Sequence, residues 1–284
     1  MNTSSCTLQL ICPDRPGLVK ELVSWVTDHK GNILHADHHT DNEAGLFLSR
    51  IEWGLDGFAV DNESIPIEVK QLARHLDGKA SVHFSDAIPR AAIFISKQSH
   101  CLLDLLWRAR SGEIRMDIPL VISNHQDLEG ICNDLDVNYY YIPNNLKYKS
   151  DSESRMLDIL LNHQIELVIL AKYMQVLTGN FIERCPPIIN IHHSFLPAFK
   201  GANPYFQAWQ RGVKLIGATA HYVTEELDDG PIIEQTLVNV SHRDEVSDLI
   251  RKGRDTERVA LATAVRLHLR HQVMVYRGRT AVFA

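Results

Sequence analysis

An amide and an imidazole stand two residues apart in the segment 189–201, which reads INIHHSFLPAFKG. Residues 188–191 form an apolar run typical of a buried strand, and side chains two apart on a strand point to the same side. Asn190 and His192 are therefore expected side by side near the carboxyl end of this strand. Two such groups suit a developing oxyanion, for which each pre-positioned donor contributes about 10²-fold or more to the rate. An isolated histidine is more often a core residue, but the neighbouring amide favours catalysis.

A carboxylate follows in a second segment, residues 217–235, which reads GATAHYVTEELDDGPIIEQ. A strand is predicted through His221 and Val223, followed by an acidic loop and a D-D-G-P turn into another strand. One carboxylate of this turn can meet the imidazole, orient water, accept its proton or hold an imidazolium. Such chemistry requires neither a metal nor a nucleophilic side chain. A solvated turn is the alternative interpretation of these acids.

The elements that position these groups have the pattern of an α/β domain. From residue 91 onward, the predicted strands are continuous apolar runs that alternate with helix-period segments, which indicates a doubly wound, mostly parallel, Rossmann-like sheet. Ligands bind at the carboxyl ends of strands in such sheets. A long amphipathic helix is predicted over about 245–271. The strand runs are 91–95, 119–122, 139–142, 167–170 and 188–191.

The first 85 residues have a different pattern. Strands that alternate apolar and polar residues, two helices and a polar hairpin turn predict a β-α-β-β-α-β, ferredoxin-like unit. The sequence thus predicts a small domain over 1–85, a connector over 86–90 and a larger domain over 91–284.

Composition excludes several classes. A formal net charge of -6 argues against a nucleic-acid partner, and no apolar run is long enough for a membrane helix. Five scattered cysteines without a C-x-x-C pair indicate a reducing compartment, and we expect a cytoplasmic protein. His35, His38 and His39 with Asp37 could suggest a metal site. Because neighbours on an extended segment point to opposite faces, no metal is expected there.

The two long motifs, with Asn190, His192 and Asp228 in order, resemble the active-site signature of the folate-dependent formyltransferase superfamily over roughly residues 90–284. The resemblance implies that these three are the catalytic residues. The phase of the motif selects Asp228, seven residues after His221, over Asp229.

Members of this superfamily differ in the acceptor of the formyl group. Those that formylate glycinamide ribonucleotide have a glycine-rich phosphate loop after the first strand, whereas residues 96–100 here read SKQSH. Water is then the simplest acceptor, and the chain is similar to the formyltetrahydrofolate deformylases, which also carry an amino-terminal ACT domain. The resemblance implies hydrolysis of 10-formyltetrahydrofolate to tetrahydrofolate and formate without a cofactor, balancing one-carbon pools for purine synthesis. The alternatives are transfer to an amine, and an amino-acid sensor with a relic folate domain.

The resemblance also implies ligand sites. In ACT domains an amino acid often binds across a domain pair, which points to Asp14 and Asn32, to glycine or methionine as effectors and to a homo-oligomer; Asp14 also suits a helix cap. The folate is expected along A-K-Y-M-Q-V-L, where Gln175 stands in place of the Arg often found in the transferases. The folate-binding residues implied are Leu170, Met174, Gln175, Leu177, Val223, Thr224, Glu225 and Glu226.

Overall fold

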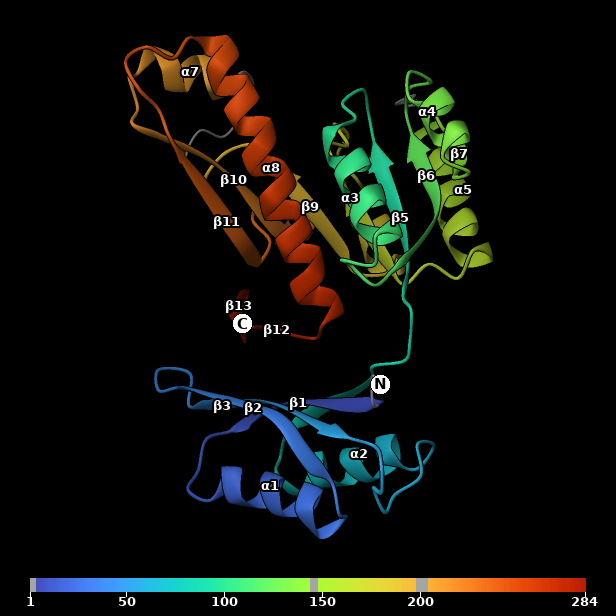
Figure 1. Cartoon of the computed structure of the whole chain (residues 1–284), viewed down its shortest axis with the longest axis vertical. Coiled ribbons are helices and arrows are strands. Elements are labelled where there is room, and N and C mark those ends of the chain that lie inside the picture. Colours follow the sequence, from blue (N-terminus) through green and yellow to red (C-terminus); the bar gives the residue numbers. More distant parts are fainter. Residues whose placement is uncertain (1–3, 144–147, 198–203) are drawn as a thin grey trace. The chain divides into compact units, whose positions relative to one another are not determined.

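The computed structural model describes residues 4–143, 148–197 and 204–284, and its helices and strands are shown in Figure 1. The chain divides into two compact units. Unit 1 comprises Met1–Ala87, Arg270–Tyr276 and Ala281–Ala284, and unit 2 comprises Ile88–Leu269 and Arg277–Thr280. No helix among the described residues has the length and apolar character that crossing a membrane requires.

Unit 1 contains the predicted β-α-β-β-α-β fold. Its elements are β1 (Ser5–Pro13), α1 (Leu18–Asp28), β2 (Asn32–Asp41), β3 (Leu46–Gly54), α2 (Ile65–His75) and β4 (Lys79–Phe84). The four strands are antiparallel, in the order β2-β3-β1-β4. Both helices pack on the sheet through apolar side chains around the buried Trp53. A side chain at position 31 would overlap Val26, so Gly31 allows the tight turn from α1 into β2.

Most of the end of the chain, Arg270–Tyr276 and Ala281–Ala284, belongs to unit 1. The sequence had instead predicted that all of 91–284 belongs to the larger domain. Two short strands, β12 (Val273–Tyr276) and β13 (Arg279–Val282), form a hairpin. The Gln9 amide donates to the carbonyls of His271 and Val273, at 2.9 and 3.1 Å. Met274 and Phe283 pack against Leu48 of β3. These contacts join segments more than 200 residues apart, so reading along the chain assigned the hairpin to the preceding domain.

Unit 2 contains the predicted doubly wound sheet. Its seven strands have the order β11-β10-β9-β8-β5-β6-β7, and β5 to β9 are parallel. The last two strands, β10 and β11, run antiparallel to their neighbours. The strands are β5 (Arg90–Ile95), β6 (Asp117–Ser123), β7 (Asn138–Tyr141), β8 (Leu167–Leu170), β9 (Ile188–His192), β10 (Leu215–Tyr222) and β11 (Ile232–Asn239).

Helices cover this sheet. Met156 and Leu160 of α5 and Phe181 of α6 pack on the central strands, where Phe94 and Leu170 complete the core. The helices α3 and α8 lie side by side in front of the sheet (Figure 1), and the amphipathic helix predicted over about 245–271 is α8. The helices are α3 (His100–Arg110), α4 (Glu129–Asp134), α5 (Lys149–Asn162), α6 (Gly179–Arg184), α7 (Pro204–Gln210) and α8 (Val246–Leu269).

Candidate active site

The two residues of the first motif lie on β9 as predicted. Asn190 and His192 alternate with buried isoleucines, and His192 is 6% exposed. The neighbouring strand β10 pairs with β9 in an antiparallel register that sets His221 opposite Asn190 and Thr219 opposite His192. The strand pairing therefore brings a second histidine to the site. The end of this motif, 198–201, lies outside the described residues.

Asp228 lies in the loop between β10 and β11, whose two ends are close together. Because β10 is antiparallel, its carboxyl end lies opposite Ile189, near the amino end of β9. The loop leaves β10 after Tyr222 and closes where the Tyr222 N–H donates to the Pro231 carbonyl at 2.9 Å. A side chain at position 230 would lie 1.7 Å from the Tyr222 carbonyl oxygen, so Gly230 is required for this return. Asp228 itself adopts φ 55, in the left-handed region.

Asp228 and His192 form a hydrogen-bonded pair. The His192 Nδ1 lies 3.2 Å from Asp228 Oδ1, and the carboxylate is 19% exposed. The hydrogen bond from His192 lowers the pKa of Asp228 below its usual value, so this carboxylate is ionised at neutral pH. Since a carboxylate only accepts hydrogen bonds, Nδ1 of His192 carries the proton. His192 Nε2 is buried and has no hydrogen-bond partner among the described residues, which leaves it available to a ligand.

Asn190 and His221 form a second pair. The His221 Nδ1 is 2.8 Å from the carbonyl oxygen of Tyr222, which accepts its proton. The unprotonated Nε2 therefore accepts from the Asn190 amide Nδ2 at 3.1 Å. Burial lowers the pKa of His221, so this ring is neutral. The pair fixes which end of the Asn190 amide is the donor and leaves a second N–H free to point elsewhere.

A cleft of about 290 Å³ opens beside these four side chains. Asn190, His192, His221 and Asp228 all line it. The loop after β8 and the loop after β10 form further parts of its wall. Eight predicted folate-binding residues line this same cleft: Leu170, Met174, Gln175, Leu177, Val223, Thr224, Glu225 and Glu226.

Comparison with known proteins agrees with the motif. The sequence profile of the formyl transferase family matches residues 89–265. Over the full length of both chains, the sequence is 55% identical to the formyltetrahydrofolate deformylase of Synechocystis sp.. The crystal structure of a formyltetrahydrofolate deformylase from Pseudomonas syringae pv. tomato is 42% identical, with a TM-score of 0.96 over 100% of this chain and 96% of that one. The chain belongs to the formyltetrahydrofolate deformylase family.

Its similarity to the transformylases is shorter. The crystal structure of glycinamide ribonucleotide transformylase 1 from Symbiobacterium toebii is 30% identical, with a TM-score of 0.66. That match covers 71% of this chain and 97% of the transformylase. Full-length similarity thus places the chain with the deformylases.

Three residues that line the cleft, and a fourth beside them, were not named among the predicted site residues. His221 was placed on a strand, but its pairing with Asn190 depends on the register of β10. Lys172 and His193 also line the cleft. Glu257 on α8 is 1% exposed, and its position in phase with the apolar residues Ala260, Leu261 and Ala264 is the signal that could have marked it as a buried acid.

Within the described ranges, one group of side chains has donor atoms close enough for a metal ion. The ligand atoms of His100, Cys101 and Glu257 lie within 4.8 Å of one another. Burial raises the pKa of the Cys101 thiol, and the Glu257 carboxylate already accepts from the Lys172 ammonium at 3.2 Å. A protonated thiol and an adjacent cation do not suit a metal, so this donor set does not fit one.

The two predicted effector residues lie far apart within one copy of unit 1. Asn32 begins β2 and pairs with Gly54, as does Ser5 at the start of β1. Asp14 follows the other end of β1, and its N–H donates to the Gly45 carbonyl at 2.9 Å. The capping role suggested for Asp14 is wrong, because α1 begins after Gly17 and has no side-chain cap.

Proposed function

We propose that this chain hydrolyses 10-formyltetrahydrofolate to tetrahydrofolate and formate. The observation that carries the proposal is the convergence of Asn190, His192 and Asp228 on a cleft walled by every residue expected to bind folate. The full-length similarity to formyltetrahydrofolate deformylases supports the same reaction. The acceptor is water.

The proposed reaction begins with water held by the Asp228 carboxylate. The water oxygen attacks the formyl carbon, and the carbonyl oxygen becomes an oxyanion that Asn190 and His192 stabilise. The tetrahedral adduct then loses N10: the C–N bond breaks, N10 takes up the proton that water released, and the formic acid product ionises to formate. Each residue has one role: Asp228 orients and deprotonates water, while the other two donate to the oxyanion.

The hydrogen bonds of the site define the charge that His192 must carry. Its Nδ1 proton is directed at Asp228, so the neutral ring has no proton on Nε2. His192 can donate from Nε2 to an oxyanion only as an imidazolium, which the adjacent carboxylate stabilises. We therefore propose that His192 is an imidazolium when water attacks, and that Asp228 holds the proton leaving water until N10 takes it.

The pterin ring is proposed to occupy the cleft. A volume of about 290 Å³ lies near the lower end of small-molecule pockets, so it suits one ring system rather than a whole folate. Gln175 and Glu226 supply polar groups beside apolar wall residues such as Leu177 and Val223. The remainder of the folate would extend out of the cleft.

Regulation by an amino acid is proposed for unit 1. Asp14 and Asn32 lie at opposite ends of the sheet in one copy, so a ligand that contacts both requires a second copy of this unit. A homo-oligomer paired through these domains, with glycine or methionine as effector, meets that requirement.

The five cysteines are free, which supports a reducing compartment such as the cytoplasm. Formate release there would balance one-carbon folates for purine synthesis.

One assay tests the reaction. Purified protein is incubated with 10-formyltetrahydrofolate and no amine, and formate and tetrahydrofolate are quantified. Equal amounts of both are expected. Transfer only when an amine is present would favour a formyltransferase instead, and glycine or methionine binding by calorimetry without formyl chemistry would favour a sensor.

A further inference from the structure

A buried charged cluster lies beside the cleft and takes no part in the reaction proposed above. The Glu257 carboxylate accepts hydrogen bonds from His100 Nε2 at 2.6 Å, Tyr205 Oη at 2.9 Å and Lys172 Nζ at 3.2 Å. Glu257 is 1% exposed and Lys172 is 7% exposed. We call these four residues the switch-point cluster.

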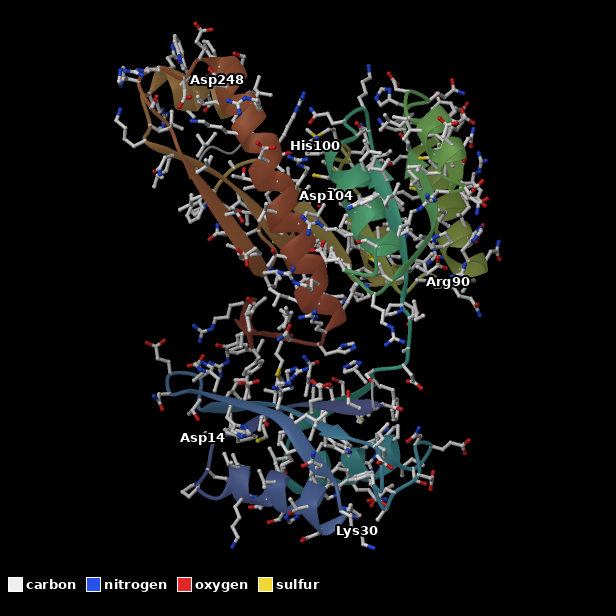
Figure 2. The ribbon with its side chains drawn as sticks, in the orientation of Figure 1. Asp14, Lys30, Arg90, His100, Asp104 and Asp248 are labelled. Atoms are coloured by element: carbon white, nitrogen blue, oxygen red, sulfur yellow. The ribbon has the colours of Figure 1, made fainter. Side chains whose placement is uncertain are left out.

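The cluster lies where a doubly wound sheet ordinarily binds its ligand. The chain runs from β5 to β6 and β7 on one side of the sheet and to β8 and β9 on the other, so the strand order reverses between β5 and β8. Ligands bind in the crevice that this reversal leaves at the carboxyl ends of the strands. Lys172 follows β8, and His100 begins α3 after β5, with α8 beside it (Figure 2).

Hydrogen bonds also close the crevice between these two loops. The Ser96 N–H donates to the Lys172 carbonyl at 3.2 Å, and the Met174 N–H donates to Ser96 Oγ at 3.0 Å. The Lys172 backbone has φ 68, a left-handed conformation that a residue with a side chain adopts only when its surroundings hold it. The loop after β8 is therefore fixed in a position that directs the Lys172 ammonium to the Glu257 carboxylate.

The side chains of the cluster pack closely against α8. A side chain at position 253 of α8 would lie 2.0 Å from the Tyr205 hydroxyl, so Gly253 gives Tyr205 its approach to Glu257. Burial alone raises the pKa of Glu257, but the His100 hydrogen bond and the Lys172 charge outweigh it and leave the pKa at about 2. The buried acid is thus fully ionised and fully paired.

The cluster borders the catalytic groups. Lys172 lines the cleft together with His192 and Asp228, whereas none of residues 96–100 lines it. The rings of Tyr205 and His193 have centroids 6.3 Å apart, and those of His193 and His192 are stacked with centroids 4.9 Å apart. Of the four cluster residues, Lys172 is the one that lines the cleft, and the other three hold it through Glu257.

We propose that the switch-point cluster fills the space through which an amine acceptor would reach the formyl carbon, and so makes water the acceptor. The proposal rests on the proposed function. In hydrolysis, water attacks, the C–N10 bond breaks and N10 gains a proton. In transfer, an amine nitrogen would attack the formyl carbon and form the new C–N bond, the C–N10 bond would break, and the proton lost by the amine would pass to N10. Both reactions use the same three catalytic residues, and access decides between them.

Two double variants test this by product ratio. Lys172→Ala with Glu257→Ala empties the space and removes both charges together, which avoids an unpaired buried ion. Lys172→Met with Glu257→Gln removes the charges but keeps the volume. Each protein is given 10-formyltetrahydrofolate and glycinamide, a small primary amine. Mass spectrometry then measures the ratio of N-formylglycinamide to formate, and circular dichroism and thermal unfolding confirm that each variant is folded.

The variant with Lys172→Ala and Glu257→Ala, called the open variant, is expected to raise this ratio by about tenfold or more over the wild type. Such a selectivity is typical of a changed pocket shape. The volume-matched variant is expected to keep the wild-type ratio. An open variant that folds and keeps the wild-type ratio overturns the proposal. If the open variant does not fold, Lys172→Ala alone, in which Glu257 keeps His100 and Tyr205, is judged by the same ratio.

The wild-type chain provides a further test that does not depend on any variant. Appreciable transfer to glycinamide by the wild type overturns the proposal, because the space would then be accessible. Absence of formate release by the wild type instead contradicts the proposed function. Hydrolysis by the wild type without transfer by a folded open variant contradicts only the role of the cluster.

Discussion

Replacing Asp228 by Asn tests the centre of the proposed mechanism. The change removes the charge that faces His192 Nδ1 at 3.2 Å but keeps the size of the side chain. A hydrogen bond to a charged group contributes roughly 1.5–3 kcal/mol, so its loss alone slows the reaction by about 10–100-fold. Losing the base that activates water contributes about 10²–10⁴-fold. We expect kcat to fall by about 10³-fold or more.

The assay separates chemistry from binding. Formate release gives kcat, and calorimetry with a non-hydrolysable folate analogue gives Kd. We expect Kd to change by less than about threefold, because Asn keeps the size of the Asp228 side chain that lines the cleft. Asp229→Asn is the matched control. Asp229 is the exposed neighbour of Asp228, and its carboxylate forms no ion pair among the described residues. Near-normal turnover of Asp228→Asn, or an equal loss in Asp229→Asn, would refute the assignment.

Three further variants probe the groups around this pair. His221→Phe removes the acceptor of the Asn190 amide, so we expect kcat to fall about tenfold with little change in KM, measured by steady-state formate release. Gly230→Ala places a methyl group against the Tyr222 carbonyl; we expect a lower Tm and at least about a hundredfold loss of kcat as Asp228 is displaced. Burial, and then the Lys172 charge, lower the pKa of His193 from 6.5 to about 4. The unfolded chain then binds more protons between these values, so stability falls as pH drops from 6.5 to 4, by up to roughly 3 kcal/mol. Urea unfolding should show a weaker pH dependence for His193→Asn; an unchanged dependence would contradict this.

The fold was predictable because its signals are local. Apolar runs of four or five residues identified each parallel strand of the larger sheet within a residue or two of its observed bounds, as at Leu167–Leu170. Alternation and turn residues identified the smaller unit in the same way. The terminal hairpin could not be assigned from such signals, because the hydrogen bonds from Gln9 that hold it span more than 260 residues of the chain.

The active site was predictable only in part, for a related reason. Strand alternation placed Asn190 beside His192, and a motif with a fixed spacing selected Asp228. His221 joins them through the register of an antiparallel pair, which no local pattern specifies. Glu257 meets Lys172 across 85 residues, and a buried ion pair of this kind has no signature beyond one acid within an apolar helical stripe.

The two histidines of the site have opposite roles because their Nδ1 atoms have different partners. The Nδ1 of His221 donates to the carbonyl of Tyr222, a neutral acceptor, and burial keeps this ring neutral. A neutral ring with its lone pair on Nε2 can orient the Asn190 amide but cannot take a proton without losing that contact. The Nδ1 of His192 donates to the Asp228 carboxylate, which stabilises a positive charge on this ring. Protonation at Nε2 breaks no contact there, because that atom has no partner among the described residues. His192 is therefore the ring that can carry the positive charge needed to donate to the oxyanion, and the amide that completes the oxyanion site keeps its orientation.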